Sequence, residues 1–343
     1  MLDYKKTGTF LASKRKQAQM TQADVAQKLG VSFQAVSKWE NGTLPFPEIP
    51  HPVLVLKSEE PGSKQKLAME YGYSESICHD MINHLVNDIM VMGARPLAVL
   101  DTIVCGSAEK ETIKSFIKGI SDACRENGCS LVGGETSIQP QVVEKGVYVL
   151  TSSIAGILSK DKVIDGSGIT EGDTVLAVAS NGLHTNGYSL VRMLMDQMPQ
   201  IKLEKIDGET FIEQIMKPHT TYRNAIWNLL ECPGIHGMAH ITGGGIQGNL
   251  CRILPDGLYA DIDLSKIKTL PIFRYIQRIG NIDEAEMLST FNCGVGLIVV
   301  VSERYAEQAI RNIAKYHDCY EIGRIRKGNG KVLFRNSVNW ESS

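Results

Sequence analysis

Four prolines crowd into the eight residues from Pro45 to Pro52, in the stretch PFPEIPHP. Proline lacks a backbone N–H and disfavours helix, so this spacing is typical of an extended linker. The stretch 45–52 therefore divides the 343-residue chain into a short head, 1–44, and a long body. The body exceeds the usual size of one hydrophobic core, and its Gly- and Asp-rich segment near residue 160 separates domains 53–160 and 161–343.

The composition is that of an ordinary globular protein, with 43% hydrophobic and 22% charged residues. The longest apolar run, GVGLIVVV, is too short to span a bilayer, and the opening MLDYKKTG lacks the apolar segment of a secretory signal. The eight cysteines include no C-x-x-C pair, which zinc and redox sites use. We therefore expect a cytoplasmic protein whose cysteines are reduced core thiols.

The head carries more positive charge than the rest of the chain. Residues 1–48 hold seven Lys and Arg residues against four Asp and Glu, a charge of +3, so the overall −2 leaves −5 for the remainder. A basic end on an acidic body is typical of a small nucleic-acid-binding module attached to a larger domain. A solvated surface would show the same asymmetry, so charge alone does not decide the function of the head.

Two short helices with a tight turn between them are predicted in the head. Thr21 is suited to cap the first, over QADVAQKL, and Gly30 to end it in a left-handed conformation. Ser32 is suited to cap the second, over FQAVSKWE. The apolar residues that face each other across the two helices are Val25, Ala26, Leu29, Val36 and Trp39. This is a helix-turn-helix arrangement, whose second helix enters the major groove of DNA.

The stretch closely resembles the Cro/repressor-type helix-turn-helix family, with matching residues from Gln22 through the SKWENG that ends at Gly42. The resemblance implies that Gln34, Ser37 and Lys38 contact bases, while Gln22 and Asn41 lie near phosphates. Such domains usually continue into further helices, whereas the proline-rich linker follows here. A helical hairpin that merely packs on the neighbouring domain remains the alternative to a DNA-binding module.

Strands and helices alternate through the body, which predicts two α/β-type domains, in a mixed α+β or α/β architecture, behind the all-α head. The expected strands are 52–57, 96–105, 129–137, 147–158, 174–180, 293–301 and 320–328. The expected helices are 76–94, 109–128, 186–198 and 302–316, and a glycine loop leads into another helix near 245.

Glycines and polar side chains recur where strands give way to turns and helices. Gly133 and Gly134, in LVGGETS, let a ligand approach the backbone, and Glu135 adds a hard oxygen suited to Mg²⁺. HITGGGIQGNL and SNGLHTNGYSL are further glycine turns that open helices and offer N–H groups to phosphate. Asp80, His84 and Asn87 share one stripe of an otherwise apolar helix. Any one such turn is weak evidence, but together they predict a phosphate-binding site.

From about Pro52 to Phe334 the chain resembles the aminoimidazole ribonucleotide synthetase family, also called phosphoribosylformylglycinamidine cyclo-ligase. The motifs that carry the resemblance are HDMINHLVNDIMVMGARPL, GCSLVGGET, GLHTNGYSLVR, HITGGG and TFNCGVG, in the family's order. The resemblance implies two α/β domains and a homodimer that holds ATP in a cleft across the subunits. The implied reaction is Mg²⁺- and ATP-dependent closure of the imidazole ring of formylglycinamidine ribonucleotide, through a phosphorylated formyl amide oxygen.

The resemblance also assigns roles to individual residues. It implies Glu59, Asp88 and Glu135 as metal ligands and His184, Asn186, His240 and Lys64 as catalytic groups. The residues that it implies for ATP and phosphate binding are Gly62, Ser63, Lys64, Asp80, Asn87, Gly133, Gly134, Thr242, Gly243, Gly244, Gly245 and Asn292. Taken singly, His184 and His240 are equally compatible with hydrogen-bonded structural histidines.

One loop departs from the family. The family has Asp-Gly-Val-Gly-Thr-Lys where this chain has EEPGSK, so Glu60 adds a negative charge and Pro61 removes an N–H donor near the phosphates. Two functions are therefore kept: a working cyclo-ligase with an added DNA-binding module, and a DNA-binding regulator whose body senses ATP or a purine intermediate. The intact motifs favour the enzyme over the sensor, and both over a scaffold without ligand.

Overall fold

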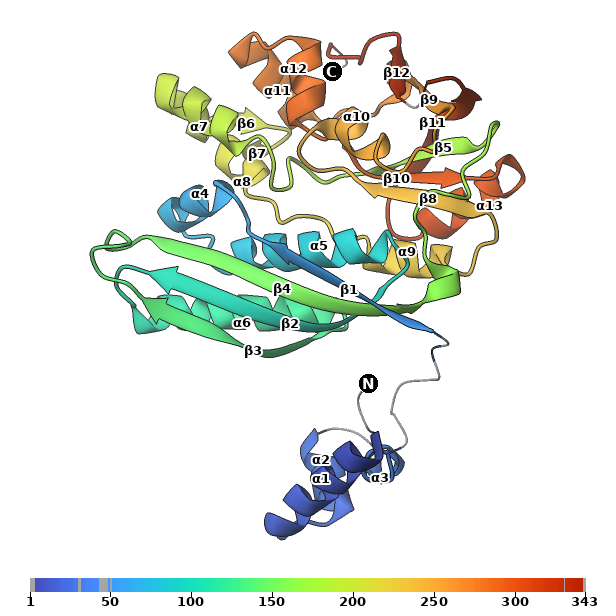
Figure 1. Cartoon of the computed structure of the whole chain (residues 1–343). Coiled ribbons are helices and arrows are strands. Elements are labelled where there is room, and N and C mark those ends of the chain that lie inside the picture. Colours follow the sequence, from blue (N-terminus) through green and yellow to red (C-terminus); the bar gives the residue numbers. More distant parts are fainter. Residues whose placement is uncertain (1–3, 30–31, 43–48, 50, 330, 342–343) are drawn as a thin grey trace. The chain divides into compact units, whose positions relative to one another are not determined.

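The computed structural model of the chain describes residues 4–29, 32–42, 49, 51–329 and 331–341 (Figure 1). It separates into two compact units, a head of Met1–Pro52 with Ser159–Asp161 and a body of Val53–Leu158 with Lys162–Ser343. No helix in the described part of the chain is both long enough and apolar enough to cross a membrane. All eight cysteines are free thiols, and only Cys251 is exposed.

The described part of the head consists of three helices, α1 (Tyr4–Gln17), α2 (Gln22–Leu29) and α3 (Phe33–Glu40). Gly8 lets α1 approach α3, because a Cβ at this position would lie 2.6 Å from the carbonyl oxygen of Glu40. Between α2 and α3, Ala26 and Val36 are buried, as expected. The predicted turn at Gly30 and Val31 and most of the proline-rich linker lie outside the described residues.

Polar contacts fix the ends of the head helices. The Thr21 hydroxyl accepts the Asp24 N–H at 3.1 Å while the Asp24 carboxylate accepts the Thr21 N–H at 2.7 Å, which confirms Thr21 as the cap of α2. The Glu40 carboxylate accepts hydrogen bonds from Arg15 Nη2 at 2.9 Å and from Gln22 Nε2 at 2.8 Å. Glu40 therefore ties α1, α2 and α3 together.

The first half of the body is a four-stranded sheet in the order β1-β4-β2-β3, with two helices on one face (Figure 1). In β1 the side chains alternate between exposed and half-buried, so one face of the sheet is covered and the other is open. Helices α5 and α6 pack on each other so closely that a Cβ on Gly119 would lie 3.0 Å from the Cβ of Cys78. The elements are β1 (Pro52–Glu59), α4 (Lys64–Tyr71), α5 (Ser76–Met90), β2 (Arg95–Cys105), α6 (Lys110–Glu126), β3 (Ser130–Ile138), β4 (Tyr148–Ser159) and a 3-10 turn, Lys160–Lys162.

The second half is a six-stranded sheet in the order β12-β9-β11-β5-β10-β8, in which only β9 and β12 pair in parallel. Helix α13 packs against β5 and β11, and α10 against β8 and β10. The strands are β5 (Thr174–Ala179), β6 (Lys205–Ile206), β7 (Glu209–Thr210), β8 (Ile235–His240), β9 (Leu258–Asp263), β10 (Val295–Val301), β11 (Cys319–Lys327) and β12 (Val332–Arg335). The helices are α7 (Tyr188–Gln197), α8 (Phe211–Ile215), α9 (Arg223–Leu229), α10 (Gly245–Leu250), α11 (Pro271–Gly280), α12 (Glu284–Thr290) and α13 (Ala306–Ile313), with 3-10 turns at Pro199–Leu203, Leu264–Lys266 and Glu303–Tyr305.

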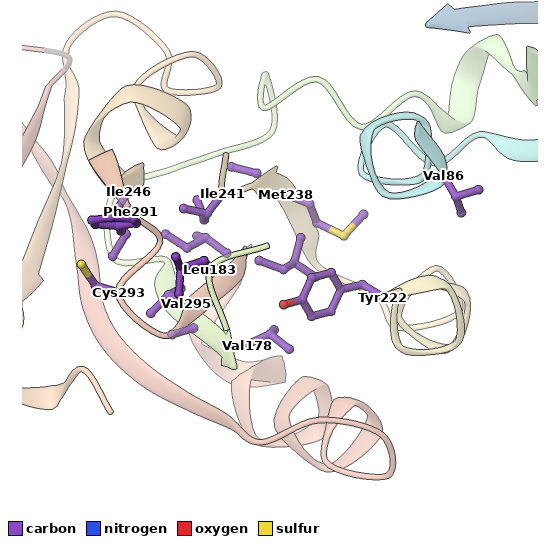
Figure 2. Close-up of a cluster of buried hydrophobic side chains, with 14 of the residues drawn as sticks. Val86, Val178, Leu183, Tyr222, Met238, Ile241, Ile246, Phe291, Cys293 and Val295 are labelled. Carbon is purple, nitrogen blue, oxygen red and sulfur yellow. The ribbon is translucent and has the colours of Figure 1, made fainter. Parts of the chain in front are cut away.

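One hydrophobic core runs from the first half of the body into the second (Figure 2). Val86 of α5 and Tyr222, just before α9, belong to the same buried cluster as Val178 of β5. The Tyr222 hydroxyl donates to the carbonyl of Ala179 at 2.9 Å, and its backbone N–H donates to Asn87 Oδ1 of α5 at 2.8 Å. Because these contacts join distant segments, α5 is held in a fixed position against the loops of the second half.

The mixed α/β architecture in two halves is as expected, and every predicted strand is present. Sequence periodicity missed the strands β6, β7, β8, β9 and β12, and it missed the helices α4, α8, α9, α11 and α12. The missed strands are short, with two to six residues each, so period-two alternation has too few repeats to be recognised in them.

Candidate active site

A cleft of about 520 Å³ lies where α5 and β1 of the first half meet the loops of the second half. Its walls are Lys57, Glu59, His84, Asp88, Val91, Met92, Asn186, Met238, Ala239, His240, Thr242, Gly243, Asn249, Arg252 and Ile253. Six residues predicted from the sequence are among them: Glu59, Asp88, Asn186, His240, Thr242 and Gly243. A separate hollow of about 590 Å³ beside Tyr71 and Lys202 contains none of the predicted residues.

Lys57 contributes a positive charge that sequence reasoning did not include. Its ammonium lies 3.0 Å from Glu59 Oε2 and 3.1 Å from Asp88 Oδ2. Burial would lower the pKa of Lys57, but Asp88 and Glu59 raise it above its ordinary value, so the ammonium keeps its proton. Two of the three predicted metal ligands are therefore already in contact with one ammonium of the same chain, whose single positive charge balances only one of them.

Glu135, the third predicted metal ligand, lies on β3 at the opposite edge of the sheet from β1. It is exposed, pairs with Thr102 across the parallel β2–β3 ladder, and is not among the residues that line the cleft. The neighbouring Gly134 is required by the sheet, since a Cβ there would lie 2.1 Å from Asp101 Oδ1. Within one chain, Glu59, Asp88 and Glu135 do not fit a single Mg²⁺ site.

Lys64 is completely buried and does not line the cleft. Its ammonium contacts Asp80 Oδ1 at 2.8 Å and donates to the carbonyls of Lys217 at 2.7 Å and His184 at 3.1 Å. Asp80 Oδ1 also accepts the backbone N–H of His219 at 2.8 Å. The pair therefore joins α4 and α5 to two loops of the second half, instead of facing a ligand.

Two asparagines that were predicted to bind ATP or phosphate instead make hydrogen bonds inside the protein. The Asn87 amide donates to the carbonyl of Thr220 at 2.8 Å and, as noted above, accepts from Tyr222, so it fixes the loop before α9. Asn292 accepts from the Ser180 hydroxyl and from Gly294 N, each at 2.9 Å. Both side chains are buried and shape the loops that surround the cleft.

The glycine loop from Gly243 to Gly245 turns sharply between β8 and α10. Gly244 and Gly245 have φ values of +92° and +59°, and a Cβ on Gly245 would lie 1.8 Å from the Leu288 carbonyl oxygen. The Asn249 amide donates to the carbonyl of Gly245 at 2.8 Å. The other predicted glycine turns contribute less to the wall of the cleft, since Gly62, Ser63 and Gly133 do not line it.

Histidines form the densest group of polar side chains at the site. His184 and His240 were predicted, whereas His219 was not, because the sequence KPHTTY around it has no glycine turn or charge pattern. His84 lines the cleft from α5, and burial and the neighbouring His240 lower its pKa to about 4. His240 contacts Asp88 Oδ1 through Nδ1 at 2.7 Å. Burial would raise the pKa of Asp88, but its hydrogen bond with His240 and the nearby charges hold it well below its ordinary value.

Arg252 also lines the cleft but was not predicted from the sequence, although it lies less than three helical turns after the glycine loop. Its guanidinium adds a second cationic group to the lining of the cleft, beside Asn249 and Thr242. A guanidinium among backbone and amide donors is typical of a phosphate-binding wall.

In the head, α3 presents the side chains predicted for DNA reading. Gln34 and Lys38 are exposed and Ser37 is half-buried, while Asn41 is exposed just beyond the helix. Gln22 differs, since its amide donates to Glu40 inside the head. The exposed face therefore has the mixture of amide and ammonium groups that base edges and phosphates accept.

The chain matches three family models: "AIR synthase related protein, N-terminal domain" over 54–158, its C-terminal counterpart over 170–336, and "Helix-turn-helix" over 11–47. It is 41% identical over 294 residues, 84% of each chain, to a Bacillus cytotoxicus protein named phosphoribosylformylglycinamidine cyclo-ligase. A Methylobacillus flagellatus protein of the same name is 43% identical, over 88% of this chain and 85% of its own. The fold is similar to that of E. coli HypE, at a TM-score of 0.61 and 19% identity over 84% and 83% of the two chains. The fold is also similar to that of a HypE in complex with ATP, at a TM-score of 0.61 and 17% identity. The match covers 85% of this chain and 83% of the HypE chain.

Proposed function

Because the chain belongs to the AIR synthase related family, we propose that its body catalyses ATP-dependent closure of formylglycinamidine ribonucleotide to aminoimidazole ribonucleotide. The observation that carries the proposal is the cleft, in which Asp88, Asn186, His240, Thr242 and Gly243 come together from segments far apart in the sequence. The relatives at 41% and 43% identity carry the cyclo-ligase name. Nucleotide binding is supported by the solved HypE complex with ATP.

In this reaction ATP phosphorylates the formyl amide oxygen, the amidine nitrogen attacks the same carbon, and phosphate leaves. Arg252 and the amides around Gly243 and Asn186 would hold the anionic groups, and they stabilise the charge that moves during transfer. His84 lines the cleft wall as a neutral imidazole and would accept a hydrogen bond from the attacking nitrogen. We place this activity in the cytoplasm, and we assign no step to Mg²⁺ because the Lys57 ammonium already contacts both Glu59 and Asp88.

The test is a direct assay with formylglycinamidine ribonucleotide, ATP and Mg²⁺, in which the aminoimidazole product is measured. We expect turnover by the native protein and loss of at least two orders of magnitude in kcat for Asp88→Asn, since this change removes the carboxylate that orients His240. Asp122→Asn, at a half-buried carboxylate of α6 that contacts Lys118 and Arg125 and does not line the cleft, is the matched control and should leave kcat unchanged. Binding of both substrates by the native protein without product would refute the enzyme proposal.

That outcome would instead support the second candidate, a DNA-binding regulator whose cleft senses ATP or a purine intermediate. Lys57 favours it, because the carboxylates of Glu59 and Asp88 already have a cation in the absence of any ligand. The exposed Glu60, next to Glu59, adds a negative charge beside the cleft. The Lys57 ammonium therefore occupies the position at these carboxylates where a catalytic metal ion would bind.

For the head we propose sequence-specific binding of duplex DNA through α3, with Asn41 and Gln22 near the phosphates. Gln34→Ala with Lys38→Ala should weaken binding to the cognate site by about 30-fold or more, because each base contact contributes on the order of 1–3 kcal/mol and the two together on the order of 2 kcal/mol or more. The control is Lys28→Ala, which removes an exposed positive charge from α2. Fluorescence anisotropy with cognate and scrambled duplexes measures the effect. Equal affinity of the native protein for both duplexes would contradict this proposal.

We further propose a homodimer that forms through the open face of the β1-β4-β2-β3 sheet. Leu54 and Leu56 on β1, Leu100 on β2 and Val132 on β3 are between 53% and 73% exposed in the single chain. An uncovered apolar sheet face of this kind is typical of a subunit interface. A partner seated there would also bring a second copy of Glu135 to the sheet, in keeping with a cleft shared by two subunits.

A further inference from the structure

Four histidines lie together at the inner end of the cleft, a cluster larger than the proposed reaction requires. His184 and His219 stack with ring centroids 3.9 Å apart and an interplanar angle of 19°. The ring of His240 is 4.9 Å from that of His219, and the ring of His84 is 5.1 Å from that of His240. His184, His219 and His240 come from three different segments, the β5–α7 loop, the α8–α9 loop and the end of β8. The fold therefore gathers imidazoles that local sequence keeps apart.

The hydrogen bonds assign most of the protons in this cluster. His240 Nδ1 lies 2.7 Å from the Asp88 carboxylate, so Nδ1 carries the proton and Nε2 has a lone pair. His219 Nε2 lies 2.8 Å from that Nε2 and must therefore donate to it. The remaining nitrogen of His219, Nδ1, is left with a lone pair.

Three imidazole nitrogens have no hydrogen-bond partner among the described residues: Nδ1 and Nε2 of His184 and Nδ1 of His219. Both side chains are 1% exposed, and neither lines the cleft. A ligand in the cleft could reach His84 and His240 but not these atoms. Buried polar atoms without a partner are costly and uncommon, so the cluster needs a further partner inside the protein.

We propose that His184, His219 and His240 bind one divalent transition-metal ion of the Zn²⁺ class, behind the cleft. Three neutral imidazoles are a common ligand set for such an ion, with a fourth position left for water or substrate. Asp88 then serves as the carboxylate that holds the far nitrogen of a metal-bound histidine, the usual outer partner of such ligands. The three histidines supply no oxygen ligand, so Mg²⁺ and Ca²⁺ are not expected here.

The geometry requires small rearrangements. One nitrogen from each of the three rings already lies within 4.8 Å of the others. Zinc–nitrogen bonds of about 2.0–2.1 Å in a tetrahedron separate the nitrogens by roughly 3.4 Å, so the 2.8 Å contact between His219 and His240 would open by about 0.6 Å. His184 would turn about its Cβ–Cγ bond, a soft torsion in histidine, to leave the stack. Gly296 has no side chain next to His184 Cε1, where a Cβ would come within 2.7 Å.

The electrostatics of the cluster suit a metal ion. Burial, followed by the neighbouring histidines, lowers the pKa of His184 and of His219 well below the ordinary value, so both are neutral near pH 7. Neutral imidazole is the form that binds metal, so neither ring has to lose an added proton, but the hydrogen bond from His219 Nε2 to His240 Nε2 must break and the His219 proton must move to Nδ1 before both Nε2 atoms bind the ion. A divalent ion here would add positive charge to the cleft wall beside Asp88. That charge would strengthen the binding of an anionic ligand in the cleft. The site serves an enzyme and a sensor equally, so it does not depend on which proposed function holds.

The test uses untagged, full-length protein stripped of metal and titrated with Co²⁺, whose visible absorption reports tetrahedral nitrogen coordination. We expect saturation at one Co²⁺ per chain, displacement by one Zn²⁺, and no competition from a large excess of Mg²⁺. His219→Gln should lose the saturable absorption, while Asp88→Asn should bind with roughly 10- to 100-fold lower affinity. His79→Gln is the matched control, a histidine of α5 that contacts Glu126 outside the cluster.

Circular dichroism establishes that each variant is folded before its titration is interpreted. No saturable Co²⁺ or Zn²⁺ binding by the native protein would overturn the proposal and leave buried water as the partner of the three nitrogens. Binding that His219→Gln retains in full would also overturn it. If His219→Gln does not fold, the native protein's zinc absorption-edge spectrum decides, because it must show three imidazole ligands.

Discussion

Replacing Lys64 by methionine should destabilise the body strongly and in a pH-dependent way. Methionine has a similar length, so the change removes the charge and three hydrogen bonds while it largely keeps the volume. In the native protein the ammonium contacts Asp80 at 2.8 Å and two carbonyls of the second half. Both charged side chains are 0% exposed, so no solvent screens the loss.

The magnitude follows from this burial. Breaking a buried ion pair by removing one partner costs about 3–5 kcal/mol, since the remaining charge is left without compensation. At low pH Asp80 becomes protonated, so the cost of the uncompensated charge disappears. The carbonyls of Lys217 and His184 still lose their hydrogen-bond donor in the variant. Each unsatisfied buried acceptor costs about 1–3 kcal/mol, so a destabilisation of about 2 kcal/mol or more remains.

The pH dependence has a definite sign. Burial raises the pKa of Asp80 to about 6 in the native protein, although Lys64 partly opposes this, and without Lys64 it rises further. A carboxyl group whose pKa is higher in the folded state loses stability as pH rises from its unfolded value to its folded value. The difference between the variant and the native protein should therefore grow above about pH 6.

Urea unfolding followed by tryptophan fluorescence, at about pH 5.5 and pH 8, measures both effects. Lys66→Met, on the exposed side of the same helix α4, is the control and should change stability by less than about 0.5 kcal/mol. Lys64→Met with Asp80→Asn should recover most of the loss at pH 8, because no buried charge remains. A loss below about 1 kcal/mol at pH 8, or one that does not depend on pH, would refute the buried ion pair.

Two further changes test the cleft and the open sheet face. Lys57→Ala leaves Glu59 and Asp88 without their ammonium at 3.0 and 3.1 Å, so the variant should gain a Mn²⁺ site, visible by electron paramagnetic resonance, that the native protein lacks. Saturable Mn²⁺ binding by the native protein at these carboxylates would show that Lys57 does not fill the metal position. Leu56→Asp should turn the homodimer into a monomer in sedimentation velocity, whereas Leu203→Asp, at a leucine 81% exposed elsewhere, should not. A native protein that sediments as a monomer would contradict the proposed interface.

Much of the protein could be predicted from sequence because the relevant signals are local. Capping of α2 by Thr21 depends on Asp24, three residues away, and the small Ala26 and the apolar Val36 mark the packed faces of adjacent helices. The long strand β10 and the stripe of α5 are likewise readable from a few consecutive residues. Such patterns identify elements and glycine turns because backbone hydrogen bonding and side-chain periodicity act between near neighbours.

The chemistry of the site was decided by tertiary structure. Sheet order places β3 at the edge opposite β1, so Glu135 lies away from Glu59, although both were expected to bind one metal ion. The alternation of β1 directs Lys57 and Glu59 to the same side, and only the packing of α5 on that side brings Asp88 to the Lys57 ammonium. His219 joins His240 through a fold-level contact across 21 residues. Sequence determined which chemical groups this chain carries, while the pairing of strands and the docking of loops, set by burial across the whole body, determined which of those groups meet.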